Sequence, residues 1–367
     1  MKNIITALVF LILCDLSFAQ SKNNSIENII IITTDGFRWQ EVFKGVDSAI
    51  AEMPQFNQTH KKEIYERYAA VSKEESRKKI MPFLWTTIAQ NGQIYGNRTY
   101  TNKVDVANPY KFSYPGYSEI FCGYVDTAIN SNKYKANPNT NVLAFLNKQM
   151  CCKQKVAAFG AWFAFDRILN EQKSGILVCC AFDSYSVNGN DSIANLINEM
   201  KQTSYKPFLE EEALDVFTHY EAMHYLKTKQ PNVLYISYGE TDEWAHEGKY
   251  LDYLEAAHNV DKWIAEIWKY VQSTPKYKNK TALFIAVDHG RGDQDKTKWT
   301  SHNAQIEDAQ QIWFAAMGPG ITAKGEIKTT MQVYQKQFAQ TFAELLGYTF
   351  ECEHPVEKGL KNILFEK

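Results

Sequence analysis

The sequence predicts an α/β protein, a three-layer α/β/α sandwich around a mainly parallel central sheet. Apolar, β-branched runs without strict alternation recur along the chain, as is typical of strands that helices cover on both faces. Helical patterns separate these runs, and this alternation favours parallel strands joined by helical crossovers. Several runs end in acidic or histidine residues, at the edge where an open α/β sheet gathers its ligands.

The elements follow in order along the chain. The expected strands are the apolar runs at 29–34, 155–160, 233–237, 283–287 and 312–317. The expected helices are 116–121, 211–227, 250–271 and 331–346. No Gly-, Pro- or Ser-rich linker and no internal repeat divides the sequence, so we expect a single domain from residue 20 to residue 367. Residues 38–79, rich in charged and aromatic side chains, are expected to form a helical insertion near the mouth of the site.

The first 19 residues have the features of a signal peptide. A short basic start precedes the apolar run from Ile4 to Leu13, and Ser17-Phe18-Ala19 supplies small residues at the two positions that a signal peptidase reads. We therefore expect cleavage after Ala19 and a periplasmic or secreted protein. A lipoprotein signal at Cys14 is disfavoured, because Leu13 stands where a small residue is expected. No later stretch reaches the roughly 20 apolar residues of a transmembrane helix.

Charge and cysteine content narrow the choice of partners. The 40 basic and 42 acidic residues give a net charge of −2, which provides no overall positive field to attract nucleic acid. In an exported chain, the even number of cysteines that remain after cleavage favours disulfides over free buried thiols, although the pairing is not readable. The CxxC spacing of a structural metal site is absent. These cysteines are Cys122, Cys151, Cys152, Cys179, Cys180 and Cys352.

Three carboxylates and three imidazoles lie at predicted strand ends or in loops. Imidazole nitrogen and carboxylate oxygen together suit zinc, so the set predicts a site for two zinc-type ions. Any one of these residues alone is more often a turn residue or a helix cap, so the prediction depends on their joint placement. The six residues are Asp35, Asp242, His246, Asp288, His289 and His302.

Ser113 is the candidate nucleophile. It stands just ahead of the expected helix at 116–121, where the helix dipole favours an alkoxide and a bound anion. The alternative is that Ser113 only caps this helix, which serine commonly does. Metal ions near Ser113 would favour its role as the nucleophile over a role as the cap.

Five motifs follow one another along the chain: Thr34-Asp35-Gly36, Ser113-Tyr114-Pro115-Gly116-Tyr117, Asp242-x-x-x-His246, Asp288-His289-Gly290 and His302. Together they resemble the alkaline phosphatase superfamily, most closely its nucleotide pyrophosphatase/phosphodiesterase branch. The resemblance implies an α/β/α sandwich that hydrolyses small phosphate esters, either diesters or monoesters. It also implies that Asp242, His246 and His302 bind one zinc ion and that Asp35, Asp288 and His289 bind the other. Ser113 would contact metal and carry a phosphoseryl intermediate.

The chain departs from the phosphodiesterase pattern after the motif proline. That branch usually has Thr as nucleophile and Asn-His after the proline, where this chain has Gly116-Tyr117. An amide donor to the phosphate is therefore expected further on, at Asn132 or at Asn130, with a turn role as the alternative.

Four further residues are candidates for substrate contacts. Trp162 and Phe165 are expected either to wall an apolar part of the substrate pocket or to pack in the core. Arg167 and Arg291 could approach the phosphate of a monoester, but a structural or surface role is favoured for both.

Two other functions compete with phosphate-ester hydrolysis. A sulfatase forms its nucleophile from Cys or Ser in a Cys/Ser-x-Pro-x-Arg motif, and Tyr117 in place of the Arg argues against this processing of Ser113. Sulfatases also generally use one calcium ion held by oxygen ligands, whereas three histidines fit zinc better. The second competitor is an exported metal-binding or ligand-binding homologue without catalysis, which the complete set of seven residues disfavours.

Overall fold

The computed structural model describes residues 26–187 and 189–366. The predicted signal peptide therefore lies outside the described residues. Within these two ranges, every helix is too short or too polar to span a bilayer.

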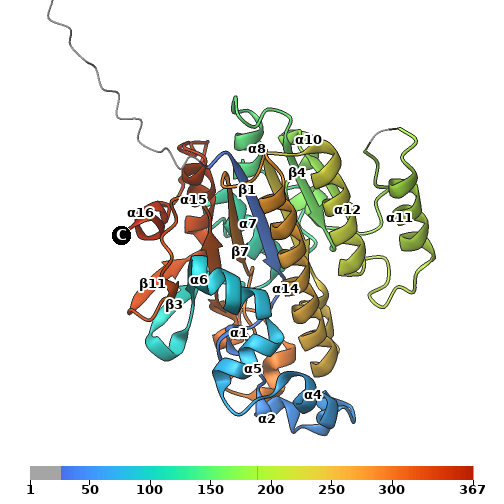
Figure 1. The fold of residues 1–367 in the computed structure, drawn as a ribbon, viewed down its shortest axis with the longest axis vertical. Helices are drawn as coiled ribbons and strands as arrows, with labels where there is room; N and C mark the ends of the chain where they lie inside the picture. The colour runs from blue at the N-terminus through green and yellow to red at the C-terminus, as the bar shows by residue number, and fades with distance from the viewer. Residues whose placement is uncertain (1–25, 188, 367) are drawn as a thin grey trace, which may run out of the picture.

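An eight-stranded sheet forms the middle layer, in the order β10-β2-β9-β7-β1-β6-β4-β5 (Figure 1). β1 (Asn28–Thr34) lies between β6 (Val233–Tyr238) and β7 (Thr281–Ala286) and is parallel to both. Every residue of these three strands is buried, which explains why their sequences are apolar without alternation.

The remaining strands extend this sheet on both sides and form a small second sheet. β4 (Val156–Gly160) and β5 (Leu177–Cys180) continue the parallel part beyond β6. β9 (Phe314–Met317) is antiparallel to β7 and to β2 (Gly92–Tyr95), and β10 (Gly325–Glu326) closes that edge. The second sheet has the order β11 (Met331–Tyr334), β3 (Asn102–Asp105), β8 (Gln311–Ile312).

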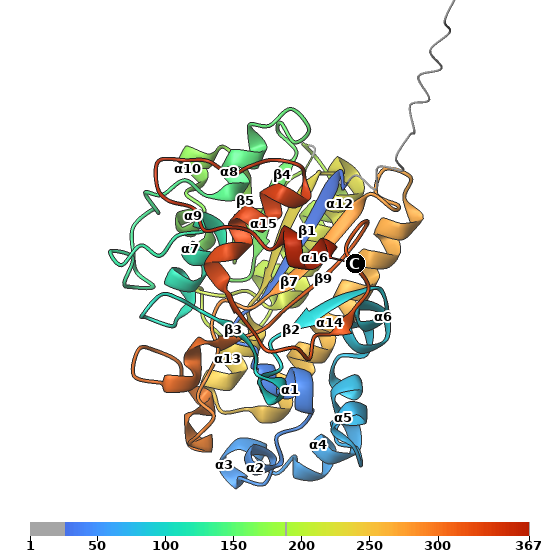
Figure 2. The same cartoon turned by 90° about the vertical axis from the view of Figure 1, so that its left-hand side faces the viewer.

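Helices cover both faces of the large sheet and complete the three layers (Figure 2). α12 (Asp215–Lys229) and α14 (Tyr250–Ser273) lie on one face. α7 (Ser113–Cys122), α8 (Val142–Asn147) and α15 (Phe338–Leu345) lie on the other. The predicted α/β/α sandwich with a mainly parallel sheet is confirmed. Further helices are α6 (Ala89–Asn91), α9 (Phe165–Ile168), α10 (Glu171–Ser174), α11 (Ser192–Thr203), α13 (Glu240–His246) and α16 (Lys361–Phe365).

The segment between β1 and β2 is helical and lies beyond the carboxyl end of β1, at the lower end of the view in Figure 1. α5 packs against α1, α4 and α14, so this segment rests on the body of the protein. Its elements are α1 (Trp39–Lys44), α2 (Ser48–Ala51), α3 (Pro54–Asn57), α4 (Lys61–Tyr68), α5 (Lys73–Ile80) and a π-helix at Leu84–Ile88. 3-10 turns elsewhere are Arg98–Tyr100, Lys296–Thr300, Glu307–Gln310 and Gln335–Gln337.

Two predicted elements are wrong in detail. The predicted strand 312–317 divides at Trp313, because Gln311–Ile312 pairs with β3 while Phe314–Met317 pairs with β2 and β7. The predicted helix 331–346 begins only at Phe338, because Met331–Tyr334 pairs with β3 as a strand. Both differences come from long-range strand pairing, which local patterns do not reveal.

The disulfide prediction is also wrong, since all six described cysteines are free. Cys122, Cys152, Cys179 and Cys180 are buried among core side chains. Cys179 and Cys180 are neighbours in β5, where successive side chains point to opposite faces of the sheet. The adjacent cysteines therefore serve as small apolar core residues.

Candidate active site

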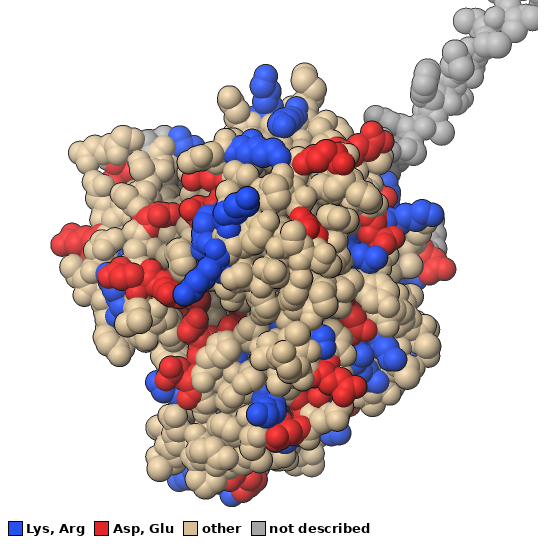
Figure 3. All heavy atoms as spheres, turned by 180° about the vertical axis from the view of Figure 1, so that it is seen from behind, with Lys and Arg blue, Asp and Glu red and all other residues tan. Residues whose placement is uncertain are grey.

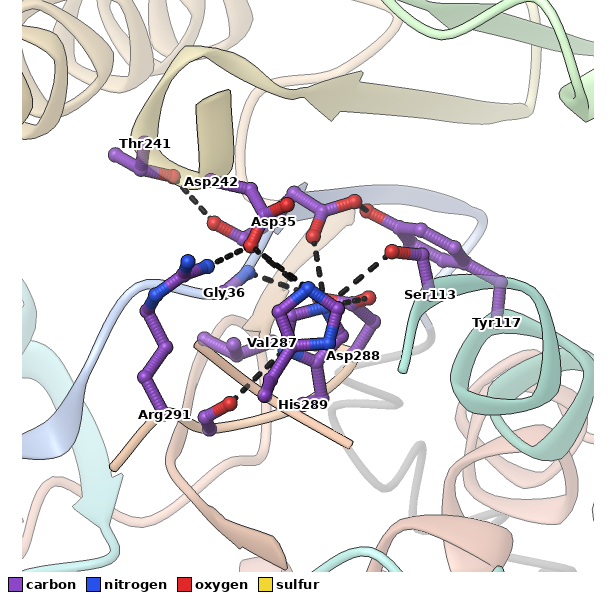
Figure 4. Close-up of polar contacts among 12 residues, drawn as sticks. Asp35, Gly36, Ser113, Tyr117, Thr241, Asp242, Val287, Asp288, His289 and Arg291 are labelled. Atoms are coloured by element: carbon purple, nitrogen blue, oxygen red, sulfur yellow. Dashed lines mark hydrogen bonds and ion pairs between the residues drawn. The ribbon is translucent and has the colours of Figure 1, made fainter. Parts of the chain in front are cut away.

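Three neighbouring strands deliver the predicted ligands to one place. β6, β1 and β7 are adjacent and parallel, so their carboxyl ends meet at the same edge of the sheet. Asp35 follows β1, Asp288 and His289 follow β7, and α13 after β6 carries Asp242 (Figure 4). This arrangement is the one expected when an open α/β sheet presents its chemistry.

His289 lies at the centre of the first group of donors. Its Nε2 lies 3.1 Å from Asp35 Oδ1 and 3.3 Å from Asp288 Oδ2. Its Nδ1 lies 3.0 Å from the Gly290 carbonyl, which only accepts, so Nδ1 donates and Nε2 faces the carboxylates. The donor atoms of Asp35, Asp288 and His289 all lie within 4.8 Å of one another.

The second group of donors lies beside the first. Asp242, His289 and His302 again offer donor atoms within 4.8 Å of one another. His246, one helical turn after Asp242, places Nε2 3.0 Å from Asp242 Oδ2 and 2.9 Å from His302 Nε2. The rings of His289 and His302 stack with centroids 3.8 Å apart. The structure thus brings all six predicted ligands together, with His289 between the two groups.

The chemistry of these donors fits metal ions. Asp35 Oδ1, Asp288 Oδ2 and His302 Nδ1 are buried and lack a hydrogen-bond partner among the described residues, a costly arrangement for polar atoms inside a protein. The Asp35 and Asp288 oxygens lie close to His289 Nε2, so that all three donor atoms could reach one ion. Nitrogen and carboxylate oxygen donors in this mixture match the preference of zinc.

The electrostatics of the cluster also favour a bound cation. Burial, and then the charge of Asp35, raise the pKa of Asp288 well above its usual range. Burial alone would lower the pKa of His289, but Asp288 and Asp35 outweigh it and raise the value to about 9. Without a metal ion, a proton is therefore retained among these groups, and a metal ion would displace it.

Ser113 is the first residue of α7 and faces this cluster. Its Oγ lies 3.3 Å from His289 Nε2, and the residue is buried (Figure 4). The helix begins at Ser113 itself, slightly earlier than predicted, so the hydroxyl stands at the positive end of a ten-residue helix. Phe112 has the extended N-cap conformation and forms no side-chain cap, so Ser113 is not the cap residue.

The loop before Ser113 is held by a buried carboxylate from inside α7. Glu119 Oε2 accepts hydrogen bonds from the Asn108 backbone at 2.9 Å and from Asn108 Nδ2 at 2.9 Å. Asn108 Oδ1 accepts in turn from the backbone of Tyr110 and of Lys111. Lys111 adopts a left-handed conformation with φ of 57°, which turns the chain into the helix. Glu119 and Asn108 therefore fix the position of the candidate nucleophile.

Two glycines allow the backbone to approach the cluster closely. Gly36 has φ of +56°, and a Cβ built on it would lie 2.4 Å from Asp242 Oδ1. A Cβ on Gly116 would lie 2.5 Å from the backbone oxygen of Asp288. The glycine that replaces Asn in the phosphodiesterase pattern thus lets α7 pack directly on the end of β7.

Three residues hold the candidate ligands in place, and the sequence did not reveal this role for any of them. Tyr117 OH donates to Asp35 Oδ2 at 3.0 Å, and Gln335 Nε2 donates to the carbonyls of Val287 and Asp288 at 2.8 Å each. Buried Arg291 pairs with Asp242 Oδ1 and donates 2.7 Å bonds to the carbonyls of Trp299 and Thr300, which precede His302. Gln335 carries no sequence signal, whereas the charged Arg291 beside His289 was a visible candidate. Its contacts fit the favoured structural role.

The remaining predicted residues divide between the site and the core. Asn132 Oδ1 accepts from the Tyr114 backbone at 3.0 Å, which places this amide at the amino end of α7, while Asn130 is exposed. Phe165 is buried against Tyr117 and Tyr235, so it is a core residue, and Trp162 is only half-buried. Arg167 donates to the Tyr134 carbonyl at 2.7 Å and lies over the Phe163 ring, with no hydrogen bond or ion pair to the cluster among the described residues.

Comparisons with known proteins identify the class of protein, a hydrolase of the alkaline phosphatase superfamily. A family model described as type I phosphodiesterase / nucleotide pyrophosphatase matches residues 83–362. The chain therefore belongs to that family. The matched stretch contains Ser113 and all the predicted ligands except Asp35, which precedes it.

Solved structures show the same fold at low sequence identity. The alkaline phosphatase PafA is similar with a TM-score of 0.59 and 10% identity, covering 93% of this chain and 99% of that one. The lipoteichoic acid synthase LtaP from Listeria monocytogenes has a TM-score of 0.58 and 12% identity, covering 93% of this chain and 76% of that one. The phosphonate monoester hydrolase SpPMH from Silicibacter pomeroyi has a TM-score of 0.51 and 12% identity, covering 92% and 76%. A comparison with curated proteins finds no match.

Proposed function

We propose that the chain is an exported two-zinc hydrolase of small phosphate esters, with one catalytic domain, and that Ser113 is its nucleophile. The observation that carries the proposal is the position of Ser113 Oγ, 3.3 Å from His289 Nε2 and at the amino end of α7. A hydroxyl placed beside two groups of metal-type donors is the arrangement that serine-based phosphoryl transfer needs. Membership of the phosphodiesterase family supports the same reaction class.

The residues have distinct roles in this proposal. Asp35, Asp242, His246, Asp288, His289 and His302 would hold two zinc ions, which when bound would acidify a hydroxyl and neutralise phosphate charge. Ser113 Oγ would lose its proton and bond to phosphorus as the ester alcohol leaves with its electron pair. Water would then hydrolyse the phosphoserine and restore the hydroxyl. Asn132, held at the amino end of α7, is the proposed amide donor to a phosphate oxygen.

The surface and the neighbouring segments fit a small substrate. Acidic and basic side chains are interspersed on the face shown in Figure 3, in keeping with the net charge of −2. The helical segment from α1 to α5 lies beyond the carboxyl end of β1, at the edge of the sheet where the cluster lies. We propose that it borders the entrance, as an insertion of the catalytic domain.

Parallel rates on an aryl phosphate, a bis-aryl phosphate and an aryl sulfate test this function. The purified protein should carry about two zinc ions, hydrolyse at least one phosphate ester faster than the sulfate, and lose turnover after chelation. One calcium ion with preferential sulfate release would instead identify a sulfatase. Metal binding without hydrolysis of any of the three esters would support a non-catalytic homologue.

A further inference from the structure

A buried carboxylate beside the cluster has no partner within the described part of the chain. Glu212 is 5% exposed, and its Oε1 is fully buried without a hydrogen bond. A Cβ built on Gly239 would lie 1.8 Å from this oxygen, so the carboxyl group packs directly against the backbone that leads into α13. Asp242 lies three residues further on. The unpartnered carboxylate therefore borders the candidate active site.

Glu212 belongs to a group of four acidic residues, two of which have hydrogen-bond donors for their carboxylates. Asp215 accepts from the backbone of Gly239 at 2.7 Å and of Glu240 at 3.1 Å. Glu240 accepts from the Asp215 backbone at 2.8 Å and from Trp244 Nε1 at 3.1 Å. For the side chains of Glu212 and Glu243, by contrast, no described residue donates a hydrogen bond or forms an ion pair.

The charges that act most strongly on Glu212 are negative. Burial raises its pKa well above the usual range, and the charges of Glu243, Asp215, Asp35 and Glu240 raise it further. Glu243, whose charge acts most strongly among them, stands in the first turn of α13, one turn after Gly239, and its backbone nitrogen lies 3.4 Å from the Gly239 carbonyl oxygen. A cation between Glu212 and Glu243 would remove this repulsion and supply the missing hydrogen bonds.

An aromatic ring completes the surroundings of Glu212. Trp162 pairs with Glu212 in an isolated antiparallel bridge, with flanking backbone bonds of 3.0 Å from Phe163 to Glu211 and from Ala213 to Ala161. Residues directly opposite in such a bridge have side chains on the same face, about 5 Å apart at Cβ. Trp162 is only half-buried, so part of its surface remains accessible. Aromatic faces attract cations.

We propose that Glu212 and Glu243, beside Trp162, bind a primary ammonium group on the alcohol portion of the substrate. This inference rests on the proposed function, because it assigns the part of the ester that lies next to the phosphate. A primary ammonium carries three N–H donors, which suit a buried carboxylate oxygen that lacks a donor. A divalent hard cation is disfavoured, because it requires about six oxygen ligands and the carboxylates of Asp215 and Glu240 are already engaged.

Direct binding tests the subsite without turnover. In the metal-loaded Ser113→Ala protein, calorimetry compares 2-aminoethyl phosphate with propyl phosphate, which has a methyl group in place of the ammonium. We expect the amine to bind about tenfold more tightly, as a charge-assisted hydrogen bond predicts. Adding Glu212→Gln should bring the two affinities to within about twofold of each other, whereas Glu211→Gln, an equal charge change on an exposed neighbour, should preserve the preference.

Several results would overturn the assignment. Equal affinities in the Ser113→Ala protein would do so, as would equally tight binding of the trimethylammonium analogue, which has no N–H donors. Loss of a metal ion from the Glu212→Gln protein would show that the carboxylate holds metal instead. If the wild-type protein hydrolyses no phosphate ester yet the Ser113→Ala protein prefers the amine, the proposed function fails and the subsite stands. Thermal melting of each variant establishes that it is folded.

Discussion

Tyr117 OH donates a 3.0 Å hydrogen bond to Asp35 Oδ2, while the other oxygen of the same carboxylate lies 3.1 Å from His289 Nε2. The phenol also contacts Ser237 Oγ at 3.1 Å and is completely buried. Such outer contacts orient metal ligands and tune their affinity. α7 therefore supplies both the candidate nucleophile and the residue that aims a candidate ligand.

Tyr117→Phe should weaken metal binding. Removal of the hydroxyl frees the Asp35 carboxylate to rotate, and we expect metal affinity and kcat/KM to fall by about 10- to 100-fold. Metal titration and steady-state kinetics measure both quantities. Tyr114→Phe is the matched control, since its hydroxyl donates to the Lys135 carbonyl instead. Equal effects of the two changes would argue against a positioning role for Tyr117.

Ser113→Ala should abolish hydrolysis while metal binding persists. We expect kcat to fall by about a thousandfold or more, because covalent catalysis depends on the nucleophile. Kinetics and metal analysis on the same preparation separate the two properties. Ser118→Ala changes a buried serine of the same helix that bonds to Asn137, and it should retain activity. Unchanged hydrolysis in the Ser113 variant would remove Ser113 from the mechanism.

Arg291→Ala should destabilise the protein and loosen the His302 loop. The guanidinium is buried, pairs with Asp242 and binds two loop carbonyls, so its loss should lower the free energy of unfolding by about 3–5 kcal/mol. Denaturant titration of the metal-loaded protein measures this change. Arg167→Ala removes a half-buried cation and should cost about 1 kcal/mol or less. A similar loss of unfolding free energy in the two variants would show that the pairing of Arg291 does not stabilise the fold.

Asp261 should make stability depend on pH near neutrality. Burial raises its pKa to about 7, while it accepts backbone bonds from Phe83 at 2.6 Å and Leu84 at 2.9 Å. The pKa of Asp261 in the folded protein exceeds its ordinary value of about 4. The stability that Asp261 contributes is therefore fully present below about pH 4 and is lost as pH rises through about 7. Between about pH 5 and 8, Tm of the parent should fall more than that of Asp261→Asn. Equal changes of Tm with pH in the parent and in the Asp261→Asn protein would contradict the assignment.

The sequence predicted the parts of the molecule that depend on local pattern. Apolar runs that stop at Asp35 and Asp288 marked strand ends, and the spacing of Asp242 and His246 matched one turn of α13. Long-range contacts were not visible: the division at Trp313, the strand at Met331–Tyr334, and the bonds from Gln335 to the end of β7. In the sequence, Gly116 was recognised only as a departure from the phosphodiesterase motif. The structure shows that it packs against Asp288.

Trapping of phosphoserine tests the central claim most directly. The zinc-loaded protein is mixed with an aryl phosphate, quenched in acid during turnover, digested, and analysed by mass spectrometry. The account predicts one phosphoryl group on the peptide that contains Ser113, absent from the Ser113→Ala protein and from chelated protein. Hydrolysis at full rate with this peptide unmodified, or with the phosphoryl group on another residue, would contradict it.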